Sequence, residues 1–130
     1  MPARIIWSDD HYVIEYSGHV VVEDSLRAYG ELVGSKKFDG ARFAILDCQA
    51  IIAVDYGPRD YDKHAAITKS AALIKRKLRI GLVVPSEEIE AEILPFMESV
   101  SNKFPHDWSR RIFRDYDQAL AWACGGSASS

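Results

Sequence analysis

Three residues in one short string have the types and spacing of a metal site. Asp60, Asp62 and His64 form a D-x-D-x-H string. In a helix, positions 60 and 64 share a face, and a carboxylate and an imidazole on one face can hold a divalent ion. Aspartates at the start of a helix also cap free amides and complement the helix dipole. Because the sequence contains no second ligand cluster, we favour capping here and expect no metal and no cofactor.

Cys48 is the second candidate for chemistry. It follows Asp47 and could combine with His64 as a thiol nucleophile. A lone cysteine after an apolar strand is more often a small packed hydrophobic residue. The spacing of residues in the sequence does not by itself connect a general base, a nucleophile and a group that orients them. An enzyme therefore ranks third among the possible functions, and a non-catalytic role is favoured. That enzyme would use Asp47, Cys48, Asp60 and His64. The chain has neither a P-loop nor a G-x-G-x-x-G motif, which argues against nucleotide chemistry.

Length and composition indicate one globular domain. The chain has 130 residues, of which 48% are hydrophobic and 27% charged, and its formal net charge is −3. This charge gives no electropositive field for nucleic acid. No apolar run approaches the roughly 18 residues of a transmembrane helix, the N-terminus lacks the apolar region of a signal peptide, and two cysteines make no disulfide framework. We therefore expect a cytoplasmic protein with no nucleic-acid partner and no transmembrane segment.

The elements that must position these residues alternate between strands and helices. The sequence predicts a hairpin of strands 4–7 and 12–17, a helix over 23–34, a strand over 42–47 and then an irregular loop over 48–60. A second helix follows, with Ile67, Ala71, Ile74 and Leu78 on one face, and then a strand over 79–84. The chain continues with a third helix from 86 to 104 that Pro95 kinks or breaks, a strand at 112–113, and a last helix that Asp115 opens. Such alternation predicts a single α/β domain over 1–124. Its sheet is five-stranded, mixed and mostly parallel, with an N-terminal antiparallel hairpin and about four helices, and a flexible tail over 125–130 follows.

This order of segments resembles a known family. The hairpin, the G-H-V-V-V-E-D entry to the first helix, the strands F-A-I-L-D and R-I-G-L-V-V, and the closing I-F-R-D-Y-D-Q-A-L-A-W are similar to SpoIIAA-like (STAS-like) domains over about residues 4 to 123. Sporulation and stress-response members are anti-sigma-factor antagonists, controlled by phosphorylation of a serine that follows an aspartate after the central strand. Here that place holds Asp47, Cys48 and Gln49. The resemblance therefore implies the fold and a regulatory role, without the phosphorylation switch.

Parallel strands sort the charges of this sequence to two edges of the sheet. The carboxyl edge would gather Asp47, Asp55, Asp60, Asp62, Glu87, Glu88, Glu90, Asp115 and Asp117. The opposite edge would gather Lys36, Lys37, Arg42, Lys75, Arg76, Lys77, Arg79, Lys103, Arg110 and Arg111. Helix dipoles account for much of this pattern. Since ligands of open α/β sheets bind beyond the carboxyl ends of the strands, we expect a partner that docks there to have a basic surface.

Apolar residues within the predicted loop give two further hypotheses. Ile51, Ile52, Val54 and Tyr56 either fold back as a lid over an apolar pocket or contact a partner. A partner surface indicates a protein-interaction or regulatory domain, or a homodimer, and this is the favoured function. A lid indicates a small apolar-ligand or lipid-binding module, which is the alternative. The predicted partner- or ligand-binding residues are Asp47, Cys48, Ile51, Ile52, Val54, Tyr56, Asp60, Asp62 and His64.

Overall fold

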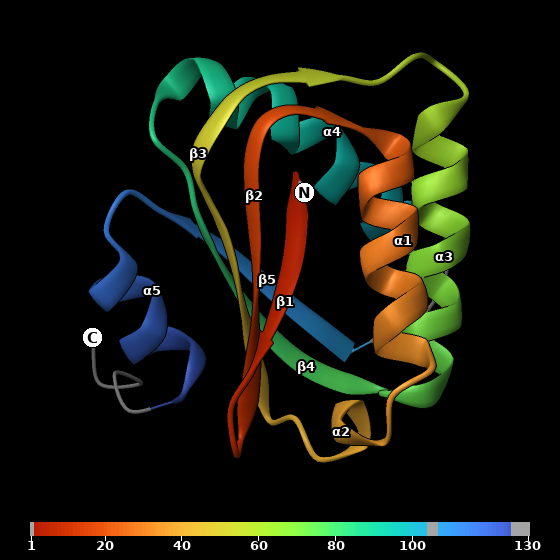
Figure 1. Ribbon diagram of the computed structural model, residues 1–130, viewed down its shortest axis with the longest axis vertical. Coiled ribbons are helices and arrows are strands. Elements are labelled where there is room, and N and C mark those ends of the chain that lie inside the picture. Colours follow the sequence, from red (N-terminus) through yellow and green to blue (C-terminus); the bar gives the residue numbers. More distant parts are fainter. Residues whose placement is uncertain (1, 104–106, 126–130) are drawn as a thin grey trace.

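The computed structural model describes residues 2–103 and 107–125, which form one α/β domain around a five-stranded sheet (Figure 1). The strands are β1 (Ala3–Trp7), β2 (His11–Val21), β3 (Phe43–Asp55), β4 (Lys77–Val83) and β5 (Asp107–Phe113), and they lie in the sheet in sequence order. β1 and β2 are antiparallel, and the other neighbours are parallel. The mixed sheet and its N-terminal hairpin confirm the predicted fold class.

Helices cover both faces of this sheet (Figure 1). They are α1 (Val22–Val33), the short α2 (Lys36–Asp39), α3 (Asp60–Ile74), α4 (Glu87–Lys103) and α5 (Tyr116–Ala123). α1, α3 and α4 pack on one face, and α5 packs alone on the other. The sequence analysis did not predict α2, which Ser35 opens by accepting a hydrogen bond from the Lys37 backbone N–H at 3.2 Å.

The alternation of side chains along the strands divides the core between these two faces. In β2, Tyr12 and Ile14 are buried on the side of α1, α3 and α4, whereas Val13 is buried on the side of α5. In β4, Leu78 and Ile80 are buried on the side of α1, α3 and α4, and Val83 is buried on the side of α5. A strand buried on both faces has a nearly continuous apolar sequence, which is why the strand segments of β3 and β4 could be predicted.

The predicted loop over 48–60 is wrong. β3 continues to Asp55, and its second half pairs in parallel with β2 as far as Val21 opposite Asp55. β4 pairs only with the first half of β3, up to Asp47 opposite Val83. The second half thus belongs to a two-stranded extension of the sheet, and β2 supplies the main-chain hydrogen bonds that a loop would lack. Only residues 56–59 then connect β3 to α3.

Other boundaries also differ from the prediction. α3 ends at Ile74, and Leu78 belongs to β4 rather than to the second helix. α4 runs through Pro95, and β5 begins at Asp107. The predicted cap of the last helix is confirmed, since the Asp115 carboxylate accepts a hydrogen bond from the Gln118 backbone N–H at 3.1 Å. Residues 126–130 of the predicted tail lie outside the described residues.

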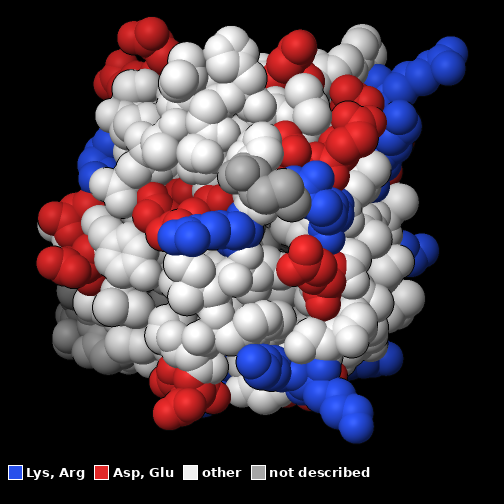
Figure 2. Space-filling model, in the orientation of Figure 1, with Lys and Arg blue, Asp and Glu red and all other residues white. Residues whose placement is uncertain are grey.

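In the described parts of the chain, no helix has both the length and the apolar character needed to span a membrane. Figure 2 shows acidic and basic side chains interspersed over one face of the molecule.

Candidate functional site

A cavity of about 70 Å³ lies between the sheet and the helices α1, α3 and α4. Apolar and aromatic side chains predominate in its lining, which is typical of sites for small molecules. The lining residues are Tyr16, Val20, Ser25, Tyr29, Leu46, Cys48, Ile51, Val54, Tyr56, His64, Leu82, Ile93, Phe96, Met97 and Arg110.

This cavity brings together part of the predicted site. Cys48, Ile51, Val54, Tyr56 and His64 all line it. They come from the second half of β3, from the turn that follows and from α3. Of the apolar residues after Cys48, Ile51, Val54 and Tyr56 therefore face a pocket, and Ile51 and Val54 lie on a strand and not on a loop.

The remaining predicted residues lie elsewhere. Asp47 borders a separate recess. The Ile52 side chain is 70% exposed, and Asp62 is exposed. One carboxylate oxygen of Asp60 accepts a hydrogen bond from the Gly57 backbone N–H at 2.6 Å, and the other lies 3.8 Å from the Lys63 ammonium group. The Asp60 carboxylate thus closes the turn before α3, in keeping with the helix-start role that was favoured over metal binding.

Two irregularities in the β2–β3 pairing explain which residues of β3 face the cavity. Glu15 pairs with Asp47 and Ser17 with Ala50, so β3 carries one extra residue there, and a second extra residue lies between Ile51 and Ala53. Each such β-bulge shifts the alternation of side chains by one position. Cys48, Ile51 and Val54 can therefore line the same cavity despite their spacing of three.

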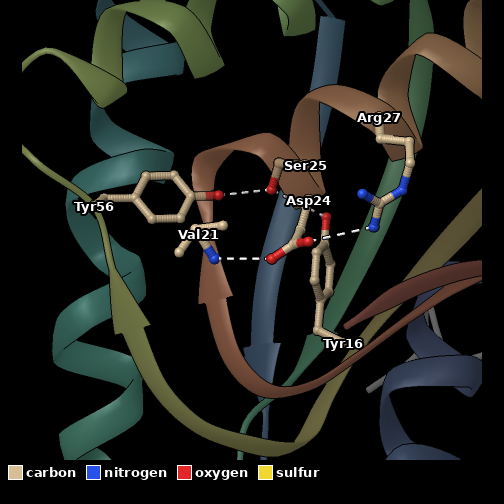
Figure 3. Close-up of polar contacts among 6 residues, drawn as sticks. All are labelled: Tyr16, Val21, Asp24, Ser25, Arg27 and Tyr56. Carbon is tan, nitrogen blue, oxygen red and sulfur yellow. Dashed lines mark hydrogen bonds and ion pairs between the residues drawn. The ribbon is translucent and has the colours of Figure 1, made fainter. Parts of the chain in front are cut away.

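A chain of hydroxyl groups joins the start of α1 to the end of β3 at the cavity wall (Figure 3). The Ser25 hydroxyl lies 2.7 Å from the Tyr56 hydroxyl and 3.5 Å from that of Tyr16. Burial raises the pKa of both tyrosines, so both phenols are neutral. Next to this chain, the buried Asp24 carboxylate accepts hydrogen bonds from the Val21 backbone N–H at 2.9 Å and from Arg27 at 3.3 Å. These contacts fix the first turn of α1 over the cavity.

His64 is packed among aromatic rings at the cavity. Its ring centroid lies 5.4 Å from that of Phe96, 5.7 Å from that of Tyr29 and 6.5 Å from that of Tyr56. Its Nδ1 atom is buried and has no hydrogen-bond partner in the described structure. Burial and, to a lesser extent, the positive charge of Arg110 lower the pKa of His64 to about 4. The imidazole is therefore neutral near pH 7.

Arg110 is a site residue that the sequence analysis placed wrongly, at the basic edge of the sheet. It lies in the middle of β5, and it lines the cavity. Alternation puts it on the same face as Trp108 and Ile112, which belong to the core under α1, α3 and α4. Its guanidinium lies 5.6 Å from the centre of the Trp108 ring, and burial lowers its pKa. The period-two pattern of Trp108, Arg110 and Ile112 was the signal that could have identified it.

The geometry weighs against thiol chemistry at Cys48. Burial and, to a lesser extent, the negative charge of Asp47 raise the pKa of the Cys48 thiol to about 12. Because the thiolate is the nucleophilic form, this cysteine is unreactive near neutral pH. In the described ranges, no group of three His, Cys, Asp or Glu side chains is placed to hold a metal ion.

The extension of β3 also divides the predicted acidic edge. Asp47 lies near the start of α5, where burial and, to a lesser extent, the charge of Asp47 raise the pKa of Tyr116. Asp55 and Asp60 lie at the far end of the extension. A basic side chain accompanies one carboxylate of this group, because Arg114 donates to Glu90 at 2.6 Å. The carboxylates therefore do not form one continuous edge.

No family model matches the chain, and no curated protein matches it. Several solved structures resemble it, including two that match nearly its whole length. An uncharacterized protein from Shewanella loihica, of the DUF3478 family with a SpoIIAA-like fold, is 19% identical with a TM-score of 0.54, and the match covers 94% of this chain and 92% of that one. The anti-sigma factor antagonist SpoIIAA in its unphosphorylated form is 8% identical with a TM-score of 0.50, and the match covers 95% of this chain and 98% of that one. Similarity at these identities shows the fold and not the function. The chain therefore has the SpoIIAA-like (STAS-like) fold.

Proposed function

We propose that this protein is a non-catalytic binding domain for a small, largely apolar molecule, held between the sheet and the helices α1, α3 and α4. The observation that carries the proposal is the cavity, whose lining is mainly aliphatic and aromatic. Concave sites lined mainly by apolar side chains, with a few polar groups among them, are typical of small-molecule binding sites. Each Å² of apolar surface that the ligand buries contributes about 25 cal/mol to its binding.

The size of the cavity limits the ligand. At about 70 Å³ the cavity is small, so only a short ligand fits into it without movement of the walls. Val54, Tyr56 and Met97 line the cavity and are also partly exposed. A longer ligand would extend between these side chains toward the surface. A short-chain apolar molecule is therefore the expected occupant.

Native mass spectrometry of freshly purified protein and an NMR titration with 1-hexanol test this proposal. We expect either a bound small molecule or saturable chemical-shift changes at residues of the cavity. Ile51→Trp, which fills the cavity, should abolish the binding. Ile52→Trp is the matched control, because Ile52 is the next residue of β3 and is 70% exposed. No saturable shifts in the wild-type protein, or equal binding by both variants, would contradict the proposal.

Binding of a protein partner, or of a second copy of the chain, is the second candidate function. It is favoured by the exposure of large apolar side chains, since Ile52 is 70% exposed and Leu73 is 65% exposed. The name of the similar SpoIIAA structure, an anti-sigma factor antagonist, agrees with a protein-binding role. The position after Asp47 holds Cys48 and not a serine, so we do not propose phosphorylation there.

A further inference from the structure

We infer that the ligand of the cavity is a small amphipathic monocarboxylate, whose anionic head group binds Arg110 and His64 and whose apolar tail occupies the rest of the cavity. This inference rests on the proposed function and names the class of ligand. It follows from two polar groups that a purely apolar ligand would leave without partners.

The first group is the guanidinium of Arg110. In the described part of the chain, the basic residues in ion pairs are Arg4, His11, Arg27, Lys63 and Arg114, and Arg110 is not among them. The phenols of Tyr12 and Tyr29 lie close enough to interact with its charge, and burial makes both of them neutral. The Arg110 side chain is half-buried, and a half-buried guanidinium without a counter-anion is unfavourable, although its contact with the Trp108 ring offsets part of that cost.

The second group is the Nδ1 atom of His64. It is buried without a partner on a ring that lines the same cavity. Both side chains line this cavity, and the charge of Arg110 adds to the larger effect of burial in lowering the pKa of His64. In the Nδ1–H tautomer, a neutral imidazole donates one hydrogen bond to a carboxylate oxygen while the guanidinium donates to the other. One carboxylate would therefore satisfy both groups.

The charge of the site selects a singly charged head group. Arg110 is the one lining residue in the described ranges that carries a positive charge near pH 7, because burial keeps His64 neutral. The remaining polar lining groups are neutral hydroxyls and the Cys48 thiol. A dianion such as a phosphate monoester would retain an uncompensated charge here, whereas a carboxylate would not. The apolar remainder of the lining then suits a short hydrocarbon tail.

NMR titrations with hexanoate and 1-hexanol at pH 7 separate the head group from the tail. We expect the wild-type protein to bind hexanoate about tenfold more tightly than 1-hexanol, because the charge-assisted bonds form only with the acid. Arg110→Met should remove this preference and leave the affinity for 1-hexanol within about twofold, since the apolar contacts are kept. Arg110→Lys, which restores the charge, should recover part of the preference. Arg111→Met is the matched control, because Arg111 is the exposed neighbour of Arg110 and also lies over an aromatic ring.

Each result bears on a different claim. Equal affinity of the wild-type protein for both probes would overturn the carboxylate inference and leave the proposed function standing. Binding of neither probe would overturn both. Thermal unfolding of the ligand-free variants distinguishes binding from a structural role. We expect Arg110→Met to be at least as stable as the wild-type protein, because it removes a half-buried charge that has no counter-anion. A less stable Arg110→Met variant that binds both probes more weakly to the same degree would show that Arg110 is structural, which would overturn the inference.

Discussion

The protonation state of His64 makes the stability of the fold depend on pH. Its pKa falls from 6.5 to about 4 on folding, so below pH 6.5 the unfolded chain binds a proton that the folded chain does not. The free energy of unfolding should therefore fall as the pH drops from 6.5 toward 4, by up to roughly 3 kcal/mol from this group. Urea unfolding at a series of pH values measures the effect, and His64→Phe should lose that part of the slope. The same slope in both proteins would contradict the assignment.

The two cysteines should differ strongly in reactivity. Cys48 is buried with a pKa of about 12, whereas Cys124 is exposed. At pH 7.5 less than about 0.1% of the Cys48 side chains are thiolates, so iodoacetamide should modify Cys124 first and reach Cys48 only when the protein unfolds. Intact-mass analysis with time, without and with urea, measures this order. Alkylation of Cys48 in the folded Cys124→Ser variant at the rate of a free thiol would restore the enzyme hypothesis.

Local sequence predicted the apolar part of the cavity better than its polar part. Ile51, Val54 and Tyr56 could be chosen because apolar side chains outside an expected strand need a reason to be there. Arg110 was missed because it and Arg111 precede the predicted strand at 112–113, which assigned both residues to the basic edge of the sheet. The alternation with Trp108 separates the two arginines, but the strand was predicted to begin only at Ile112, so its period was not visible.

At the scale of the elements, the sequence predicted the strand segments of the sheet and missed its extension. The first half of β3 is covered on both faces and is almost wholly apolar, which identifies it. Its second half pairs with β2 alone and contains two bulges, so it shows neither a continuous apolar run nor a regular alternation. Gly18, with a φ of +68°, lies where the pairing shifts. Pairing of this kind depends on a partner strand distant in sequence, which local propensities do not contain.

α5 packs tightly on the sheet at a glycine of β4. A Cβ atom at Gly81 would lie 3.1 Å from the Ala119 carbonyl oxygen and 3.2 Å from its Cβ atom. Gly81→Ala should therefore push α5 away from the sheet and lower the free energy of unfolding by roughly 1–3 kcal/mol. Gly30→Ala is the control, because nothing lies within 4 Å of the added atom in α1, and it should stabilise the protein by roughly 0.5–1 kcal/mol. Urea unfolding measures both, and a neutral Gly81→Ala would show that α5 shifts without cost.

For the whole molecule, the two faces of the sheet are packed differently. α5 packs closely against the face that carries Phe43 and Ile45, and Ala119 and Ala123 fill that contact. The other face bears three helices, and side chains from all three reach the cavity, as Tyr29, His64 and Phe96 do. A ligand in this cavity would touch α1, α3 and α4 together, so we expect binding to couple these helices and to stabilise the fold through the mass-action effect.

Association with a partner should depend on Ile52 and not on Ile51. Ile52 is 70% exposed, so Ile52→Ser should change the free energy of unfolding by no more than about 0.5 kcal/mol. Ile51 is 8% exposed and lines the cavity, so Ile51→Ser should cost about 2 kcal/mol or more through lost apolar burial. Light scattering reports the oligomeric state, and binding kinetics report the complex with any purified partner. If the β3 extension forms the interface, Ile52→Ser raises the off-rate or dissociates the dimer while the fold stays intact. A complex that tolerates Ile52→Ser and is weakened only by Ile51→Ser would contradict this prediction. The weaker binding would then result from unfolding of the Ile51→Ser variant, and the interface would lie away from the β3 extension.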